Sequence, residues 1–248
     1  MTIASEITRI KTAIADAYTA CQDMGATMPA VLNSDNLEQC IASIGGGGSA
    51  TVLHLYDRVD NKATVAGFWT GGGGQRYAVC VVDAAYRVSR QLWSNQAVDT
   101  ELPNYTSESA ALAAGESATY NTNVILNTYI PSNYPAFNAA RNACTVMIND
   151  KTLKSCLPNA AELQMIWNDK ATLDTYDTTL TEYPDNSLTR WTIGGNSNFY
   201  NCWSSTENSA SGGWYLSSSG SWGLGSSSSQ CGVIPIIEIK VDENGEVQ

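Results

Sequence analysis

A catalytic, metal-binding or phosphate-binding site in this sequence would have to use its cysteines, its histidine or its glycine-rich segments. Seven cysteines stand at positions 21, 40, 80, 144, 156, 202 and 231. Their number is odd and none has Cys-x-x-Cys spacing, so the sequence predicts neither a zinc centre nor a disulfide framework. We expect buried free thiols that pack as small hydrophobic side chains.

Other catalytic patterns are also weak. His54 is the single histidine, lies in a predicted strand, and has no Gly-x-Ser-x-Gly segment to serve. The two four-glycine runs, 45–48 and 71–74, lack the lysine and the hydroxyl residue of a phosphate-binding loop. The sequence therefore predicts no catalytic residue, no metal and no cofactor.

Composition narrows the classes of partner. The chain has 248 residues, of which 43% are hydrophobic and 15% charged, with a formal net charge of −11. Its basic residues are scattered, which argues against nucleic-acid binding, and an acidic surface argues against anionic lipid. No apolar run reaches membrane-spanning length. The N-terminus lacks signal-peptide features, so we expect synthesis in a host cytoplasm and retention there until assembly or lysis.

The N-terminal region predicts a separate helical segment over residues 1–44. Isoleucines recur at spacings of three and four along a predicted helix over 3–24, and a second short helix is predicted over 35–44. Two such stripes are too small to form a core alone. We therefore expect neighbouring copies of this chain to cover them, with a trimer as one arrangement. Residues 45–50 predict a glycine-rich linker.

From residue 51 the pattern predicts an α+β domain. Strands are expected over 51–56 and 63–68 as a hairpin, and over 76–83, with a loop at 71–74 between them. Helical character is expected at 108–114 and within 121–147. A further helix should start at Leu157-Pro158-Asn159, where Pro and Asn suit the first turn and Glu162 its positive end. A last strand is expected over 233–239, with Pro235 marking an edge or bulge.

The segment 190–240 combines spaced aromatic residues with many serines and glycines. A flexible linker has no reason to carry Trp203, Trp214 and Trp222, so we expect an ordered segment. Strand alternation places Trp214 and Leu216 inward, with Tyr215 and Ser217 outward, and places Trp222 and Leu224 together on one side. Large residues would hold the framework and small polar residues would decorate it.

Four segments in this order carry a resemblance to a known family: 157–163 (LPNAAEL), 202–207 (CWSSTE), 213–216 (GWYL) and 233–237 (VIPII). They resemble the C-type lectin fold of the formylglycine-generating-enzyme type, as used by the variable proteins of diversity-generating retroelements. The resemblance covers residues 51–240, with a tail at 241–248, and the block 157–237 is its specific part. The N-terminal segment is similar to the opening of phage structural proteins.

The resemblance implies a variable region over about 196–232, where reverse transcription randomises adenines in asparagine codons. Such changes yield Ser, Gly, Tyr or Cys but never Trp, Gln or Glu. The implied ligand-binding candidates are Asn198, Tyr200, Asn201, Ser209, Ser211, Gly212, Tyr215, Ser217, Ser219, Ser221, Gly223, Gly225, Ser226, Ser227, Ser228, Ser229, Cys231 and Gly232. The implied scaffold is Trp203, Ser204, Ser205, Glu207, Trp214, Leu216 and Trp222.

The function implied is host attachment: a hypervariable receptor-binding protein, not an enzyme, on the tail of a phage virion. Its partners would be a bacterial surface receptor, either protein or glycan, and phage tail proteins that bind residues 1–44. Two alternatives stay open. One is a bacterial cell-surface adhesin of the same fold, and the other is a formylglycine-generating-type oxidase, whose relatives bind copper with two cysteines.

Two departures from the family pattern accompany these expectations. Ile234 stands where the family often carries arginine, and Cys202 and Cys231 lie 29 residues apart, far from a close cysteine pair. The tripeptide Trp167-Asn168-Asp169 supplies calcium ligands in vertebrate C-type lectins. Here it follows a helix and lacks a companion motif, so we interpret it as coincidence.

Overall fold

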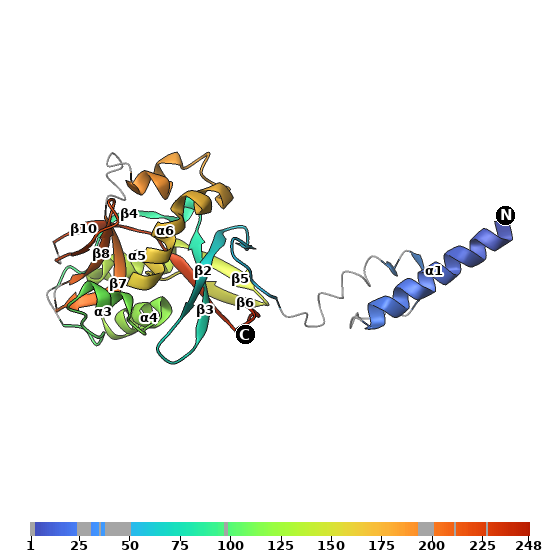
Figure 1. The fold of residues 1–248 in the computed structure, drawn as a ribbon, viewed down its shortest axis with the longest axis horizontal. Helices are drawn as coiled ribbons and strands as arrows, with labels where there is room; N and C mark the ends of the chain where they lie inside the picture. Colours follow the sequence, from blue (N-terminus) through green and yellow to red (C-terminus); the bar gives the residue numbers. More distant parts are fainter. Residues whose placement is uncertain are drawn as a thin grey trace. The chain divides into compact units, whose positions relative to one another are not determined.

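The chain forms two compact units, Met1–Thr51 and Val52–Gln248, which are considered separately (Figure 1). The computed structural model describes residues 3–23, 31–34, 36–37, 51–96, 99–192, 201–210, 212–226 and 228–248. Of the helix predicted over 35–44, only residues 36 and 37 are described, and both are helical. The predicted linker 45–50 lies outside the described residues.

Helix α1 (Ile3–Asp23) dominates the first unit and confirms the predicted helix. Near its C-terminal end Tyr18 and Cys21 are buried, with Leu37 packed against them. The Tyr18 hydroxyl donates to the carbonyl of Asn33 at 2.7 Å. Toward the other end Ile7 and Ile10 are each about half exposed. Among the described residues of this unit, the apolar stripe of α1 is therefore covered only toward its C-terminal end.

The second unit is an α+β fold built on two sheets. The first has the order β1-β2-β3-β11, with β1 (Arg58–Val59), β2 (Ala63–Thr70), β3 (Arg76–Val82) and β11 (Ile236–Val241). Each neighbouring pair is antiparallel. The central strand β3 is continuously apolar from Ala78 onward and is buried on both faces, as such runs usually are.

The second sheet has the order β4-β10-β7-β8-β9. Its strands are β4 (Val88–Leu92), β7 (Asn201–Ser209), β8 (Gly212–Ser217), β9 (Trp222–Leu224) and β10 (Gln230–Val233). Strand β10 runs parallel to β7 and places Gly232 opposite Cys202. A separate hairpin joins β5 (Thr145–Ile148) to β6 (Lys151–Lys154).

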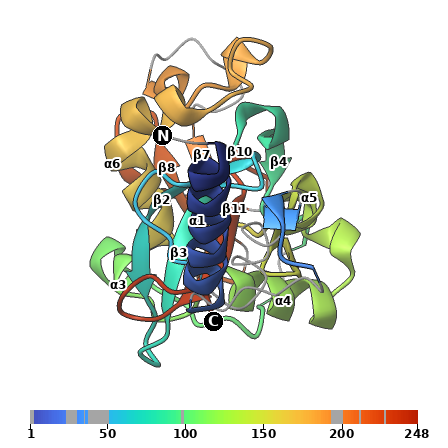
Figure 2. The same cartoon turned by 90° about the vertical axis from the view of Figure 1, so that its right-hand side faces the viewer.

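The helices of this unit are α3 (Glu108–Leu112), α4 (Ala118–Thr128), α5 (Pro135–Ala143) and α6 (Ala160–Tyr176). Asn159 caps α6 and forms a capping box with Glu162, so the helix starts where the sequence predicted. Short 3-10 turns occupy 84–86, 131–133, 184–186 and 189–192. Figure 2 shows α6 on one side of the strands and α4 with α5 on the other.

Three predicted elements were wrong in their bounds. Residues 51–56 form no strand, because the carboxylate of Asp57 binds the backbone N–H of His54 at 2.7 Å and the chain turns there. The helical pattern over 121–147 divides into α4 and α5, since prolines at 131 and 135 interrupt it, and it ends in strand β5. Pro235 divides the last predicted strand between the two sheets.

The residues after 240 belong to the domain, so the predicted end of the domain at 240 was wrong. Val247 forms a bridge with Val241, and Glu246 forms one with Val52. The backbone N–H of Gln248 donates to the carbonyl of Lys240 at 3.0 Å. The last residues therefore fold back and pair with β11.

Within the described part of the chain, no helix has the length and apolar character to cross a membrane.

Candidate functional site

Three tryptophans anchor the backbone of the predicted variable region. Trp203 is fully buried, Trp214 is 5% exposed and Trp222 is half-buried. Each indole N–H donates a hydrogen bond at 2.8 Å, Trp203 to the carbonyl of Gln91, Trp214 to that of Tyr105 and Trp222 to the side chain of Gln164. The prediction that large rings face inward here is confirmed for Trp203 and Trp214.

The Ser204–Glu207 segment of β7 is a buried polar seam. The Ser204 hydroxyl donates to the carbonyl of Trp214 at 2.9 Å, and the Ser205 hydroxyl accepts from the Asn121 amide at 3.1 Å. The Thr206 hydroxyl accepts from the backbone N–H at the start of α6, at 3.0 Å. Every side chain in this segment is buried. The motif therefore joins β7 to its neighbours, because buried polar groups need partners.

Glu207 closes this seam and has an unusual environment. Its carboxylate accepts a hydrogen bond from the Thr100 hydroxyl, while its Oε1 is buried without a partner among the described residues. Burial raises the pKa of the Glu207 carboxyl to about 7. The carboxyl is therefore half-protonated near neutral pH, which a surface glutamate would not be.

The ligand-binding candidates that are fully exposed among the described residues are all serines. Ser209, Ser219, Ser221, Ser226 and Ser228 are exposed, and Asn201, Tyr215, Ser217, Gly223 and Ser229 are partly so. Several of the serine hydroxyls bond one another, as Ser217 and Ser219 do at 2.8 Å, and the Ser217 hydroxyl also accepts from the backbone N–H of Ser221 at 3.2 Å. Ser226 and Ser228 pair in the same way at 2.9 Å. Side chains with such contacts contribute little to folding, so they are open to change.

Four of the ligand-binding candidates are wrong, since they are buried: Gly212, Gly225, Cys231 and Gly232. A Cβ atom at Gly225 would lie 2.1 Å from the ring of Trp203, and one at Gly212 would lie 1.8 Å from the carbonyl oxygen of Gly225. Cys231 is 2% exposed within the core around Trp203. A side chain at Gly225 would therefore displace the Trp203 ring, and one at Gly212 would displace the backbone at Gly225.

Two further residues face differently from the sides that strand alternation predicted for them. Leu224 was expected beside Trp222 on the covered side but is 56% exposed. Tyr215, expected to face outward, packs against Trp203 with ring centroids 6.0 Å apart. Both faces of β8 are partly covered, whereas β9 lies at the sheet edge, where nothing covers Leu224 among the described residues. The candidates Asn198, Tyr200, Ser211 and Ser227 lie outside the described residues.

The cysteines do not form the pair that the oxidase alternative would need. Cys202 packs in the core beneath α6, whereas Cys231 packs in the core that contains Trp203. The two lie on opposite faces of neighbouring strands, since the residue opposite Cys202 is Gly232. Burial raises the pKa of Cys231 to about 12 and that of Cys202 well above its ordinary value. Six cysteines are described, and all are buried free thiols, as predicted.

The tripeptide Trp167-Asn168-Asp169 and His54 make hydrogen bonds and ion pairs with other side chains of the domain. Asn168 accepts a hydrogen bond from Gln164 at 2.9 Å, and Asp169 accepts one from the Tyr56 hydroxyl at 2.6 Å. His54 is exposed and pairs with Asp57 at 3.3 Å. No cluster of three or more metal-ligating side chains occurs among the residues that the structure describes.

A buried pair of acids, Glu162 and Glu238, escaped the sequence analysis. Burial raises the pKa of Glu162, and the charge of Glu238 and a hydrogen bond to it raise that pKa further. Glu238 accepts backbone N–H bonds from Ala118 at 3.0 Å and Thr119 at 2.6 Å, at the start of α4. The pair joins α6, β11 and α4. The sequence does not indicate it, because Glu162 and Glu238 are far apart in the chain and meet only when β11 packs beside α6 and α4.

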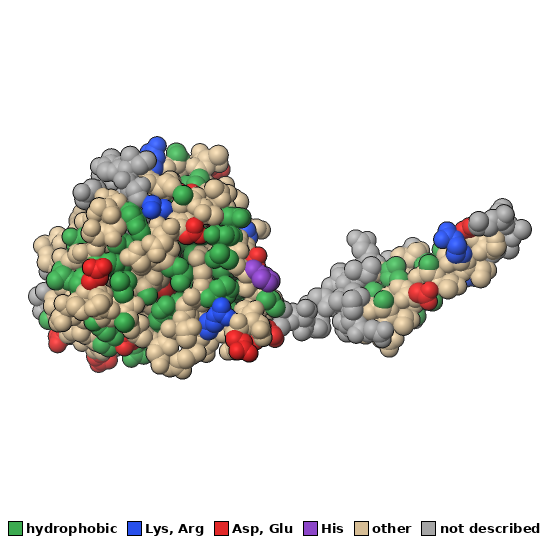
Figure 3. All heavy atoms as spheres, viewed as in Figure 1, with side chains coloured by type: hydrophobic (Ala, Val, Ile, Leu, Met, Phe, Trp, Pro, Cys, Tyr) green, Lys and Arg blue, Asp and Glu red, His purple; other side chains and the backbone are tan. Residues whose placement is uncertain are grey.

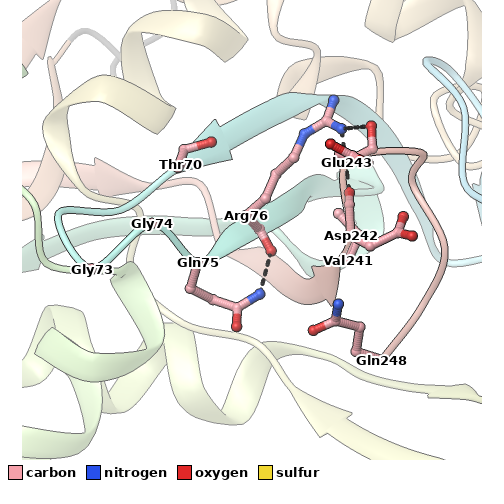
Figure 4. Close-up of a pocket in the computed structure, with 9 residues that line it drawn as sticks. All are labelled: Thr70, Gly73, Gly74, Gln75, Arg76, Val241, Asp242, Glu243 and Gln248. Atoms are coloured by element: carbon pink, nitrogen blue, oxygen red, sulfur yellow. Dashed lines mark hydrogen bonds between the residues drawn. The ribbon is translucent and has the colours of Figure 1, made fainter.

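Several surface pockets of this unit, among them the one in Figure 4, are lined by residues other than the predicted site residues. The pocket in Figure 4 has a volume of about 480 Å³ and lies between the β2–β3 turn and the C-terminal residues. There Arg76 donates to the carbonyls of Asp242 and Glu243 and lies over the Phe68 ring at 4.4 Å. Its guanidinium holds the last turn of the chain in place.

Charge is sparse over the visible surface. On the face in Figure 3, lysine and arginine side chains are few and separated.

Comparisons with protein-family models, curated proteins and solved structures find no match to this chain. The physical features of residues 201–232 are therefore the basis of the functional proposal.

Proposed function

We propose that this chain is a ligand-binding protein of the C-type lectin fold, diversified by a retroelement and carried on a phage tail for attachment to a bacterial surface receptor. One observation carries the proposal. Exposed serines on the β8–β9 turn and after β9 stand on a backbone held by buried tryptophans and by the seam at 204–207. A surface of that kind tolerates changes of side chain without loss of the fold.

The site is a display surface and uses no catalytic group. Small serines on rigid turns offer hydroxyl groups, and Tyr215, Trp222 and Leu224 offer apolar contact area. Paratopes combine such adaptable polar groups with aromatic anchors. The exposed isoleucines of α1 would associate with other copies, and several weak sites on one particle would bind with avidity. The partner would be a bacterial protein or glycan.

The genomic test is direct. A reverse-transcriptase gene nearby, together with an imperfect copy of the 190–240 coding segment that differs only at adenines, is the expected result. Tail genes alongside would favour the virion over a cell-surface adhesin. A neighbourhood with neither a reverse transcriptase nor such a copy would contradict the diversification.

The binding test uses the full chain on a panel of bacterial strains. Tyrosine at Ser219 and Ser221 should change which strains are bound while the melting temperature stays within about 2 °C. Ser89→Tyr is the matched control, because Ser89 is exposed on β4, at the opposite edge of the same sheet. Equal changes of binding from Ser89→Tyr would contradict the assignment of the display surface.

A further inference from the structure

Strand β9 forms one edge of the five-stranded sheet. It pairs with β8 so that Tyr215 lies opposite Gly223, with Leu216 opposite Trp222 and Trp214 opposite Leu224. The backbone N–H of Ser217 donates to Ser221 at 2.9 Å, and that of Gly225 donates to Gly213 at 3.0 Å. Hydrogen-bonded pairs alternate along an antiparallel ladder. The Tyr215–Gly223 pair is therefore a hydrogen-bonded one, and its two neighbours are not.

This register leaves the main-chain groups of Trp222 and Leu224 directed away from β8. Each of the two residues presents one N–H and one C=O at the edge, two residues apart, which is the spacing that another strand requires. Within the described part of the chain, no hydrogen bond to these groups is found. The edge therefore offers two donors and two acceptors in the plane of the sheet.

The side chains beside β9 leave this edge accessible on both faces. On one face the Tyr215 ring lies over Gly223, where a Cβ atom would come within 2.4 Å of it. On the other face Leu224 is 56% exposed, and Trp222 is held by its bond to Gln164. An incoming strand would thus meet an aromatic ring on one side and an aliphatic side chain on the other.

Natural edge strands resist strand addition by being very short or by carrying lysine, proline, a bulge or a cover. Among the described residues, β9 has only the first of these protections, since it spans Trp222–Leu224. No charged residue occurs between Glu207 and Glu238, and no proline occurs before Pro235 in that interval. Strand β9 is short, but the serines on either side of it present no bulk. A partner without charge suits such a surface, since a charged one would lose hydration without gaining an ion pair.

We infer that the β9 edge binds an extended, uncharged peptide segment of the receptor by β-strand addition. The inference rests on the proposed function and narrows its partner to a protein. Main-chain hydrogen bonds would supply a constant part of the affinity, and alternate side chains of the peptide would contact Tyr215 and Leu224. The exposed serines around the edge would then supply the part that differs between variants.

The test selects binders from a displayed library of random uncharged ten-residue peptides, using the full chain as bait. Leu224→Pro removes one outward N–H and places a ring at the edge, a position where an edge strand tolerates proline. Leu224→Ala is the matched control, because it keeps the N–H and removes the same side chain. Unfolding curves check that both variants fold. Selected peptides are also synthesised with N-methyl groups at alternate residues.

We expect selected peptides to bind the Leu224→Ala variant within a few-fold of the unchanged chain and the Leu224→Pro variant at least tenfold more weakly. N-methylation in one register should abolish binding and in the other should not, a readout that does not depend on how the proline variant folds. Equal binding to the proline variant, or no enriched peptide, would overturn the inference. The inference would also be overturned if the unchanged chain and the Leu224→Ala variant self-associated and the Leu224→Pro variant did not. The strand that occupies the β9 edge would then belong to a second copy of this chain. The proposed function is tested separately. If Ser219→Tyr and Ser221→Tyr changed which bacterial strains are bound, the proposed function would stand even though the inference about the β9 edge had failed.

Discussion

Replacing Trp203 should show how strongly the display surface depends on the core beneath it. The ring is fully buried, donates to Gln91 at 2.8 Å and packs against Tyr215. Truncating a buried tryptophan to alanine costs roughly 3–5 kcal/mol in cavity and transfer terms. The Gln91 carbonyl loses its partner, which adds about 1 kcal/mol. For a domain of this size, the melting temperature should fall by roughly 10–15 °C.

The assay is urea and thermal unfolding of the full chain, followed by tryptophan fluorescence and far-UV circular dichroism. Trp203→Phe keeps most of the volume and loses the hydrogen bond, so a smaller loss of about 1–2 kcal/mol is expected. Tyrosine at Ser221 should change the free energy of unfolding by no more than about 0.5 kcal/mol. Similar losses from Trp203→Ala and Ser221→Tyr would refute the division into framework and display surface.

Two further predictions concern charge and assembly. The pKa of Glu207 is raised to about 7 from an ordinary value near 4.5, so its stabilising proton is fully retained below pH 4.5 and lost as pH rises through 7. The free energy of unfolding should therefore fall by up to roughly 3 kcal/mol across that interval relative to Glu207→Gln. Parallel slopes for the unchanged chain and Glu207→Gln would contradict the buried carboxyl. Aspartate at Ile7 and Ile10 should convert an oligomer to a monomer in analytical ultracentrifugation, because these side chains are about half exposed on α1. An unchanged mass, or a monomeric unaltered chain, would contradict assembly through α1.

Features governed by neighbouring residues were predicted well. The capping box of Asn159 and Glu162 starts α6 where the local pattern indicated, and β3 is buried as its apolar run predicted. Prolines explain two of the three elements that were placed wrongly, since at 131, 135 and 235 they interrupt patterns that otherwise looked continuous. Pro235 is the clearest case, because it ends β10 in one sheet and precedes β11 in the other.

The roles of the small residues depended on contacts distant in the chain. Ser221 and Gly225 fitted the same pattern, yet the first is exposed and the second lies under the Trp203 ring. Likewise, the pKa of Glu207 reflects its burial beside Thr100, more than a hundred residues earlier in the chain. A residue without bulk has no hydrophobicity by which to indicate its side, so the pattern alone could not distinguish these positions.

By itself, the sequence indicated that buried aromatic side chains hold the backbone of residues 201–232 in a defined structure. It also indicated that the polar side chains of this segment are small. Only the tertiary structure decided which small residues face solvent, that Leu224 is uncovered, and that β9 is an edge. The physical reason is that a large ring gains free energy from burial through its own apolar area, whereas a serine or glycine has little such area, so its exposure depends on what the rest of the chain places over it.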